Sequence, residues 1–327
     1  MTETLSLPAG LRLARYRIAL APESKLALPT NPGATLRGGL ALALKRGVCV
    51  KPSGELCGKR CELPTVCPYA FLLESPTPPD AEVLRTSQEV PHPYLLEPPL
   101  TPPYVVEAGA LLPFHLVLFG SAIRYFPYLL AACRALGQEG LGPARIRCRL
   151  AAGSFLGPDG QEISLFDGAT QRVLGNQPPA PVVSDWAPGS QTEVRHLTLH
   201  FRTPARLKHA DRFVEGPPPF HVVIRALLRR VSSLSYFYGG QRWDVDYRGW
   251  IARAEAVQIA QAAVDWVDWE RYSTRQERTM NLGGIVGRVA YSGDLAPFLP
   301  LLRLGELVHV GKAAVFGNGR FEVAEGA

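Results

Sequence analysis

The chain has 327 residues, a hydrophobic fraction of 46% and a formal net charge of +6. This length and apolar content allow two domains with separate cores and exclude an intrinsically disordered protein. The basic excess permits binding to polyanions but is too modest to identify one. The start of the chain lacks the pattern of a signal peptide and no run of about 18 apolar residues occurs, so we expect a cytoplasmic protein without a membrane span.

The first half predicts the order strand, helix, strand, strand, helix, strand from its apolar periodicities. The expected elements are Leu11 to Ala21, Thr35 to Arg46, Tyr104 to Glu107, Leu111 to Phe119, Ala122 to Leu136 and Arg145 to Leu150. A hairpin extension at Gly153 to Asp167 follows the last strand. The proline-rich stretch from Pro76 to Pro103 is expected to be irregular.

The second half repeats this order. Its expected elements are a strand at Glu193 to Phe201, a basic amphipathic helix at Pro219 to Tyr238, paired strands at Val264 to Gln276 and Thr279 to Tyr291, a helix at Ala296 to Val308 and a strand at Arg320 to Val323. The order βαββαβ is typical of a ferredoxin-like domain. The sequence therefore predicts an α+β protein of two tandem ferredoxin-like domains with antiparallel sheets, residues 1–175 and 193–327, joined by a proline-rich linker at residues 176–192.

Four cysteines lie close together in the first half, at Cys49, Cys57, Cys61 and Cys67. In a reducing compartment clustered thiols favour a metal over disulfides, and four thiolates can complete a tetrahedral zinc site. The spacing is not the paired CxxC of common zinc ribbons, so free or paired thiols and an iron–sulfur cluster remain alternatives. A zinc ion held by four thiolates has no open position, so the predicted role is structural.

A glycine-rich segment, GELVHVGKAAVFGNGR, lies between the last expected helix and strand. Glycines allow close backbone approach to a phosphate, and Lys312 and Arg320 add positive charge. A nucleotide-binding P-loop is excluded, because five residues separate Gly305 from Gly311 instead of four and Ala313 follows the lysine. The open alternatives are a phosphate-binding loop and a loop whose glycines only form turns.

This segment, continued as GELVHVGKAAVFGNGRFEV, resembles the C-terminal glycine-rich signature of the RAMP-superfamily endoribonucleases that process CRISPR repeat transcripts. The stretches LRGGLALALKR, CPYAFLLESP, LHFRTPARLK, RALLRRVSSLSYFYGG and YSGDLAPFLPLLRLGELVHVG resemble the same family in the same order. Several long motifs in order are more specific than any one of them.

The resemblance implies a tandem ferredoxin-like protein that binds a repeat stem-loop and cleaves precursor crRNA without metal. In such a reaction the 2′-hydroxyl attacks the adjacent phosphate, leaving a 2′,3′-cyclic phosphate and a 5′-hydroxyl. The expected partners are CRISPR repeat RNA and, after cleavage, the subunits of an effector complex.

The sequence departs from this family at the first helix. Many relatives carry a histidine there, whereas this chain has Leu42 near the expected place. We expect Arg37 to be an active-site cation, His309 the acid or base, and Arg242 a further contributor to the site. The alternatives are a helix-capping role for His309 and a solvent-exposed turn for Arg242.

Basic residues near these positions are the candidate RNA contacts. Arg225 and Arg229 lie one turn apart on the basic helix, a spacing that can follow phosphates, although an ordinary solvated face is the alternative. The full predicted set is Lys45, Arg46, Arg225, Arg229, Arg230, Gly311, Lys312, Gly317, Gly319 and Arg320. His196 and His200 share one face of a strand and could bind a metal or RNA, but a plain surface role is expected.

Two rival functions remain. The first is a binding module of the same fold that has lost nuclease activity, as the missing helix histidine would suggest. The second is a zinc-dependent hydrolase built on the cysteine cluster. Protection of the RNA without cleavage would favour the first, and loss of cleavage on chelation would favour the second.

Overall fold

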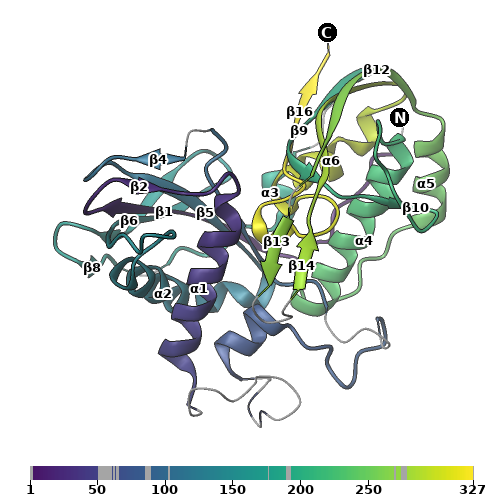
Figure 1. Cartoon of the computed structure of the whole chain (residues 1–327). Coiled ribbons are helices and arrows are strands. Elements are labelled where there is room, and N and C mark those ends of the chain that lie inside the picture. The colour runs from purple at the N-terminus through teal and green to yellow at the C-terminus, as the bar shows by residue number, and fades with distance from the viewer. Residues whose placement is uncertain are drawn as a thin grey trace. The chain divides into compact units, whose positions relative to one another are not determined.

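The computed structural model describes residues 3–50, 61, 63, 66–84, 90–101, 104–175, 177–188, 193–268, 270–273 and 278–326. The chain forms two compact units (Figure 1). The N-terminal unit comprises Arg12–Pro181 and Phe237–Gly239, and the C-terminal unit comprises Met1–Leu11, Val182–Tyr236 and Gly240–Ala327. Among the described helices, none has the length and apolar character needed to cross a bilayer.

This division differs from the expected one at both ends of the first domain. The first eleven residues belong to the C-terminal unit, where the Leu5 amide donates to the Pro297 carbonyl at 3.1 Å. The Trp243 indole donates to the Ser6 carbonyl at 3.0 Å in the same unit. The second boundary falls after Pro181, within the expected linker.

The N-terminal unit contains a six-stranded sheet in the order β3-β5-β1-β6-β7-β8. Its main elements are β1 (Leu13–Pro22), α1 (Pro32–Val48), β3 (Tyr94–Glu97), β5 (Leu112–Phe119), α2 (Phe126–Glu139), β6 (Cys148–Leu156), β7 (Glu162–Asp167) and β8 (Arg172–Val173). The smaller elements are β2 (Leu26–Ala27), η1 (Ala70–Glu74), β4 (Val105–Val106) and η2 (Gly120–Tyr125). Both β5 and β6 pair antiparallel with β1, and α1 and α2 lie on one face of the sheet (Figure 1). This arrangement confirms the ferredoxin-like fold expected for the first half.

Alternation along β1 supplies the core of this unit. Tyr16 and Ile18 are fully buried on one face, and the Tyr16 ring stacks on Phe126 of α2 at 3.7 Å between centroids. On α1, Leu36, Leu40 and Leu44 recur at helical spacing and are also buried. Alternate residues of the strand and every fourth residue of the helix are apolar, and both sets are buried at one interface. The sheet and the helices therefore share a single core.

The second strand of this unit differs from the expected one. Residues Val105–Val106 form only a two-residue ladder with Leu26–Ala27, outside the main sheet. The edge strand is instead β3, inside the proline-rich stretch that was expected to be irregular. Prolines bracket an edge strand without breaking its ladder, which hides it from a reading of the sequence.

The last expected strand of the first half begins three residues late. Arg145 has a φ of 51°, which places it in the left-handed region and in a turn, so β6 starts at Cys148. The hairpin from β6 to β7 occurs as expected and closes through the Gly157 amide, which donates to the Gln161 carbonyl at 2.7 Å.

The C-terminal unit repeats the fold with the strand order β12-β15-β9-β16. Its main elements are β9 (His196–Ala205), α4 (Phe220–Tyr238), α5 (Tyr247–Glu255), β12 (Gln258–Val267), β15 (Gly284–Ser292), α6 (Leu299–Val308) and β16 (Phe321–Glu325). The smaller elements are α3 (Val183–Trp186), β10 (Lys208–His209), β11 (Arg212–Phe213), β13 (Glu270–Ser273), β14 (Arg278–Asn281), η3 (Ala296–Phe298) and η4 (Ala314–Phe316). In the N-terminal unit β6, which follows α2, pairs with the first strand β1, and in the C-terminal unit β16, which follows α6, pairs with the first strand β9. This correspondence confirms the tandem fold.

Three features of this unit were not expected from the sequence. Helix α5 begins after Asp246, whose side chain accepts from the Gly249 amide at 3.0 Å. The expected strand pair is interrupted, so that β12 and β15 form its main part and β13 and β14 a separate ladder. A short hairpin, β10–β11, follows β9.

A buried ion pair provides a test of the N-terminal sheet. Arg15 donates to Glu97 Oε2 from Nη2 at 2.6 Å and from Nε at 3.1 Å, and the Glu97 side chain is only 1% exposed. Arg15→Met leaves this carboxylate without its main partner, and we expect it to lower the free energy of unfolding by about 2–3 kcal/mol in urea denaturation. Arg15→Met with Glu97→Met should recover most of the loss.

Arg17 is the matched control. It pairs with Glu162 at 3.5 Å, and their side chains are 47% and 43% exposed. Arg17→Met should change the free energy of unfolding by less than about 1 kcal/mol. Equal losses for Arg15→Met and Arg17→Met would contradict the importance of the buried pair.

Candidate nucleic-acid interface

The glycine-rich loop is tightly packed against the end of β9. The Lys312 amide donates to the Arg206 carbonyl at 3.1 Å, and the Gly319 amide donates to the Pro204 carbonyl at 3.0 Å. A Cβ on Gly319, which has a φ of 72°, would lie 1.8 Å from the Val310 carbonyl oxygen. Gly319 therefore serves close chain packing, as the turn-forming alternative proposed, and no phosphate contact follows from it.

His309 lies at the end of α6 as its C-cap and has no exposed surface. Its Nδ1 is 3.1 Å from the Asn318 carbonyl oxygen, across the loop. A side chain buried in this way does not reach an RNA on the surface. The structure therefore favours the helix-capping role over the catalytic role predicted for His309.

Lys312 belongs to a cluster of cations, which we call the Phe213 cluster. Three positive groups surround the Phe213 ring: Arg206 Cζ at 3.9 Å, Lys208 Nζ at 5.4 Å and Lys312 Nζ at 5.8 Å from its centroid. Burial lowers the pKa of Lys312, and the charges of Lys208, Arg206 and Arg229 lower it further. These like charges repel one another, so the Phe213 cluster is a site that a bound anion would stabilise.

The arginines of α4 divide into two groups. Arg225 and Arg229 are exposed one turn apart, as expected for residues that could follow phosphates. Arg230 is only partly exposed, and its Nε donates to the Val308 carbonyl at the end of α6. Arg230 thus stabilises a helix C-terminus, which is a structural role that its position in the sequence did not reveal.

Of the remaining predicted residues of this unit, Arg242 is exposed, Arg320 is partly exposed and Gly317 is buried. Arg242 is exposed and its guanidinium lies 5.7 Å from the centroid of the Tyr236 ring, beside an aromatic side chain as expected. The Arg320 amide donates to the Thr203 hydroxyl at 2.9 Å, and the Thr203 hydroxyl donates to the Gly317 carbonyl at 2.7 Å. Arg320 and Gly317 are therefore both fixed to β9 through one threonine.

His196 and His200 share one face of β9, as expected, and His200 pairs across the sheet with Arg288 and Glu322. Burial lowers the pKa of His200, and Arg202 and Arg288 lower it further against the opposing effect of Glu322. These charged neighbours place His200 on a polar surface of the sheet.

In the N-terminal unit, Arg37 lies in a polar and aromatic cluster on α1. Burial lowers its pKa, but Tyr94, Tyr69 and Glu74 raise it by more, so that the net direction is upward. The Lys45 ammonium lies 5.7 Å from the centroid of the Tyr69 ring. Arg37 and Lys45 of α1 thus both interact with Tyr69, the residue before η1.

Two other positions on α1 differ in character. Arg46 forms an ion pair with Glu139 of α2 at 2.5 Å, and its role as an RNA contact stays a prediction. Leu42, near the place where relatives carry a histidine, is 44% exposed. The position faces solvent, but its side chain cannot exchange protons.

The predicted zinc site lies partly outside the described residues, because Cys57 is not among them. Cys49, Cys61 and Cys67 are partly exposed. Within the described ranges, no group of three or more metal-binding side chains is assembled. The zinc site stays a prediction.

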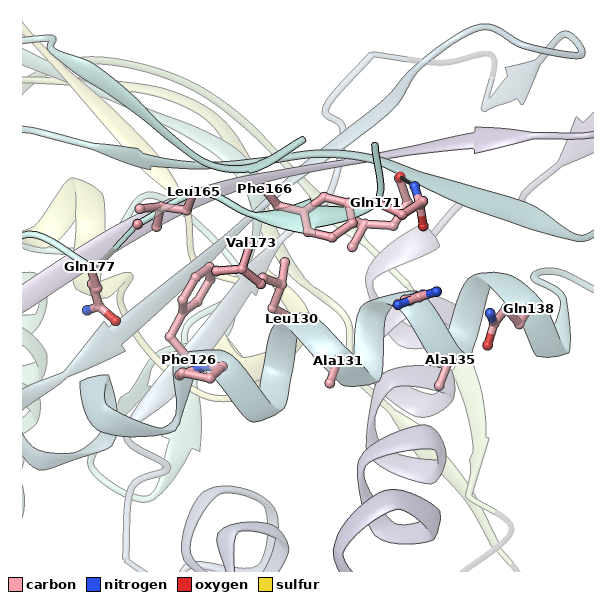
Figure 2. Close-up of a pocket in the computed structure, with 14 residues that line it drawn as sticks. Phe126, Leu130, Ala131, Ala135, Gln138, Leu165, Phe166, Gln171, Val173 and Gln177 are labelled. Carbon is pink, nitrogen blue, oxygen red and sulfur yellow. Dashed lines mark hydrogen bonds between the residues drawn. The ribbon is translucent and has the colours of Figure 1, made fainter. Parts of the chain in front are cut away.

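A groove of about 700 Å³ lies between α2 and the strands β6 to β8 of the N-terminal unit (Figure 2). Phe126 and Leu130 of α2 point toward Leu165 and Phe166 across it, and most of its lining is apolar. Arg134 is the one cation of its lining. None of the predicted site residues lines it, and an apolar groove is a poor match for a phosphate backbone.

Reasoning from the sequence missed Arg206, Lys208 and Phe213. Arg206 follows the last residue of β9, and Lys208 and Phe213 lie on the two-residue strands β10 and β11. Such short strands give no periodic pattern in the sequence. The available signal is compositional, since RLKHADRF places basic residues around an aromatic residue and a turn.

The two halves of the chain match two protein families. Residues 11–178, about half of the chain, match the AF_1859 N-terminal domain family. Residues 199–321 match the CRISPR-associated endoribonuclease Cas6 family. An uncharacterized protein of Archaeoglobus fulgidus is 27% identical over 314 residues, which are 90% of this chain and 92% of the relative.

Solved structures share the fold at low sequence identity. Thermus thermophilus Cas6 has a TM-score of 0.54 at 15% identity, covering 97% of this chain and 100% of its own. A Cas6 product complex has a TM-score of 0.55 at 16% identity, covering 96% and 99%. A partial Cas6-RT-Cas1–Cas2 complex has a TM-score of 0.59 at 14% identity and covers 98% of this chain, which spans only 47% of that protein.

The family matches cover both halves and the shared fold covers almost the whole chain. The resemblance inferred from the sequence motifs is thereby confirmed. The chain belongs to the AF_1859 N-terminal domain family, and its residues 199–321 match the CRISPR-associated endoribonuclease Cas6 family.

Proposed function

We propose that this chain is a metal-independent endoribonuclease that binds CRISPR repeat stem-loops, cleaves precursor crRNA and retains the mature crRNA for an effector complex. The observation that carries the proposal is the Phe213 cluster, which gathers Arg206, Lys208 and Lys312 on a Cas6-like fold, with the charge of Arg229 acting on Lys312. Such a concentration of positive charge suits the phosphates of an RNA backbone.

The proposed reaction needs a base for the 2′-hydroxyl, a proton for the leaving oxygen and positive charge opposite the developing phosphorane. Arg37 suits the third role, because its guanidinium stays charged and Tyr94, Tyr69 and Glu74 raise its pKa further. Arg242, stacked beside Tyr236, suits contact with a base or phosphate. The expected products are a 2′,3′-cyclic phosphate and a 5′-hydroxyl.

A second candidate function is a crRNA-binding RAMP protein that does not cleave. The exposed Leu42 on α1, where relatives carry a histidine, favours it. It differs from the first candidate in lacking a group that removes the proton of the 2′-hydroxyl.

The deciding experiment incubates the purified chain, in EDTA, with the repeat RNA of its own genomic neighbourhood and with a copy carrying a 2′-deoxy group at the cleavage site. Cleavage of the first RNA alone, with a cyclic phosphate end, supports the proposal. Tight binding with no cleavage supports the binding protein. Loss of cleavage in EDTA that zinc restores would support a zinc hydrolase, and absence of binding would contradict all CRISPR roles.

The Phe213 cluster predicts the salt dependence of RNA binding. Lys208→Gln with Lys312→Gln removes two cations, and the slope of log Kobs against log salt should become shallower by about 1–2, because each lost phosphate contact removes about 0.7–0.9. Filter binding of repeat RNA over a range of salt concentrations measures it.

Lys25→Gln is the matched control. Lys25 is an exposed lysine paired with Glu107 at 2.8 Å in the N-terminal unit, and we expect its slope to equal that of the unmodified chain. A double variant with an unchanged slope would show that the Phe213 cluster does not contact phosphates.

Arg37 predicts a separation of cleavage from binding. Arg37→Ala should slow single-turnover cleavage by about 100-fold while weakening RNA binding by less than about tenfold, because a charge opposite the phosphorane acts mainly in the transition state. Arg37→Lys keeps the positive charge but not the planar guanidinium with its paired donors, so its cleavage rate should be intermediate. Equal losses in both measurements would contradict a catalytic role, and thermal unfolding of each variant excludes a misfolded protein.

A further inference from the structure

A histidine outside the predicted site lies next to the cluster around Arg37. Ser75, the C-cap of the short helix η1, places Oγ 2.8 Å from Nδ1 of His92. The His92 ring is also 6.2 Å from the ring of Tyr94, which interacts with Arg37. His92 and Arg37 therefore share Tyr94 as a neighbour.

The main chain around His92 is fixed although its side chain is partly exposed. Three hydrogen bonds hold it, from the Val90 amide to the Ser75 carbonyl at 3.0 Å, from the Tyr238 hydroxyl to the Pro91 carbonyl at 2.8 Å and from the Phe119 amide to the Pro93 carbonyl at 2.9 Å. The prolines on both sides restrict the backbone further. A histidine presented in this way is preorganised for proton transfer.

The contact with Ser75 also selects the tautomer of His92. The Ser75 hydroxyl lies 3.1 Å from the Phe71 carbonyl oxygen and 3.2 Å from the Leu72 carbonyl oxygen, which can only accept. Its one proton is donated to them, so it accepts from Nδ1–H of His92. Neutral His92 then carries its lone pair on Nε2, the atom that a general base uses.

We infer that His92 is the general base for cleavage, an inference that rests on the proposed endoribonuclease function. Nε2 takes the proton of the 2′-hydroxyl as the 2′-oxygen bonds to the adjacent phosphorus and the bond to the 5′-oxygen breaks. The departing 5′-oxygen takes a proton from water, and His92 later releases its proton to solvent. His92 thus supplies the titratable group that α1 lacks.

The pH dependence of cleavage tests this role. Among the described residues, the Ser75 hydroxyl after η1 and the Tyr94 ring of β3 lie against His92, and Arg37 of α1 interacts with Tyr94. Of these and His92, only the histidine ordinarily gains or loses its proton near neutral pH. Because only neutral imidazole accepts a proton, the cleavage rate should rise between about pH 5 and 7.

His92→Asn keeps a donor for the Ser75 hydroxyl but has no titratable nitrogen. We expect it to slow single-turnover cleavage of repeat RNA by about 10²- to 10³-fold, to remove the rise with pH and to change Kd by less than about threefold. Added imidazole should restore part of the activity of His92→Ala, an effect that a purely structural histidine would not show.

His115→Asn is the matched control, since His115 is a partly exposed histidine of the same unit that lies 3.5 Å from Glu97. It should cleave at the unmodified rate. The inference is overturned if His92→Asn keeps its activity and its pH profile, if it loses binding and cleavage equally, or if His115→Asn alone abolishes cleavage. An unmodified chain that binds repeat RNA without cutting it would overturn the proposed function and this inference with it.

Discussion

Main-chain hydrogen bonds between the glycine-rich loop and the end of β9 determine where the cations of the C-terminal unit lie. The Lys312 amide binds the carbonyl of Arg206, so the two basic side chains start from adjacent backbone. This approach needs Gly311 and Gly319, since a Cβ at either position would lie within 2.6 Å of a carbonyl oxygen. The glycines act here through backbone packing, and the phosphate-binding chemistry falls to the side chains that this packing gathers.

Several basic residues outside the Phe213 cluster have a defined acceptor for their charge. Arg46, Arg202 and Arg303 have carboxylate partners within 3.0 Å, and Arg230 binds the carbonyl end of a helix. The Phe213 cluster places cations beside cations. Their mutual repulsion raises the free energy of the unbound protein, and a bound anion would reduce it. A modest net charge is therefore compatible with strong local attraction for RNA. The attraction comes from neighbouring cations, which repel one another in the free protein.

Periodicity predicted most of the fold, since helices and strands in both units bury one regular face each. It failed where elements are short or framed by prolines, as at β3 and at the β10–β11 hairpin. The candidate site was predicted less well, because its contacts join residues distant in sequence. Nothing in the sequence shows that His309, the C-cap of α6, turns its side chain inward against Asn318, or that Phe213 collects three cations.

The missing histidine of α1 is weak grounds for inferring an inactive protein. Proton transfer requires a group of suitable basicity, held at the reacting oxygen, and does not require that it come from a particular helix. In the N-terminal unit, η1 and β3 bring an oriented imidazole to the cluster that holds Arg37. Since the Ser75 hydroxyl has a single proton, already directed to the carbonyl oxygens of Phe71 and Leu72, the imidazole is left with its basic nitrogen away from η1. A base supplied by the segment before β3 would explain how α1 can carry a leucine in an active enzyme.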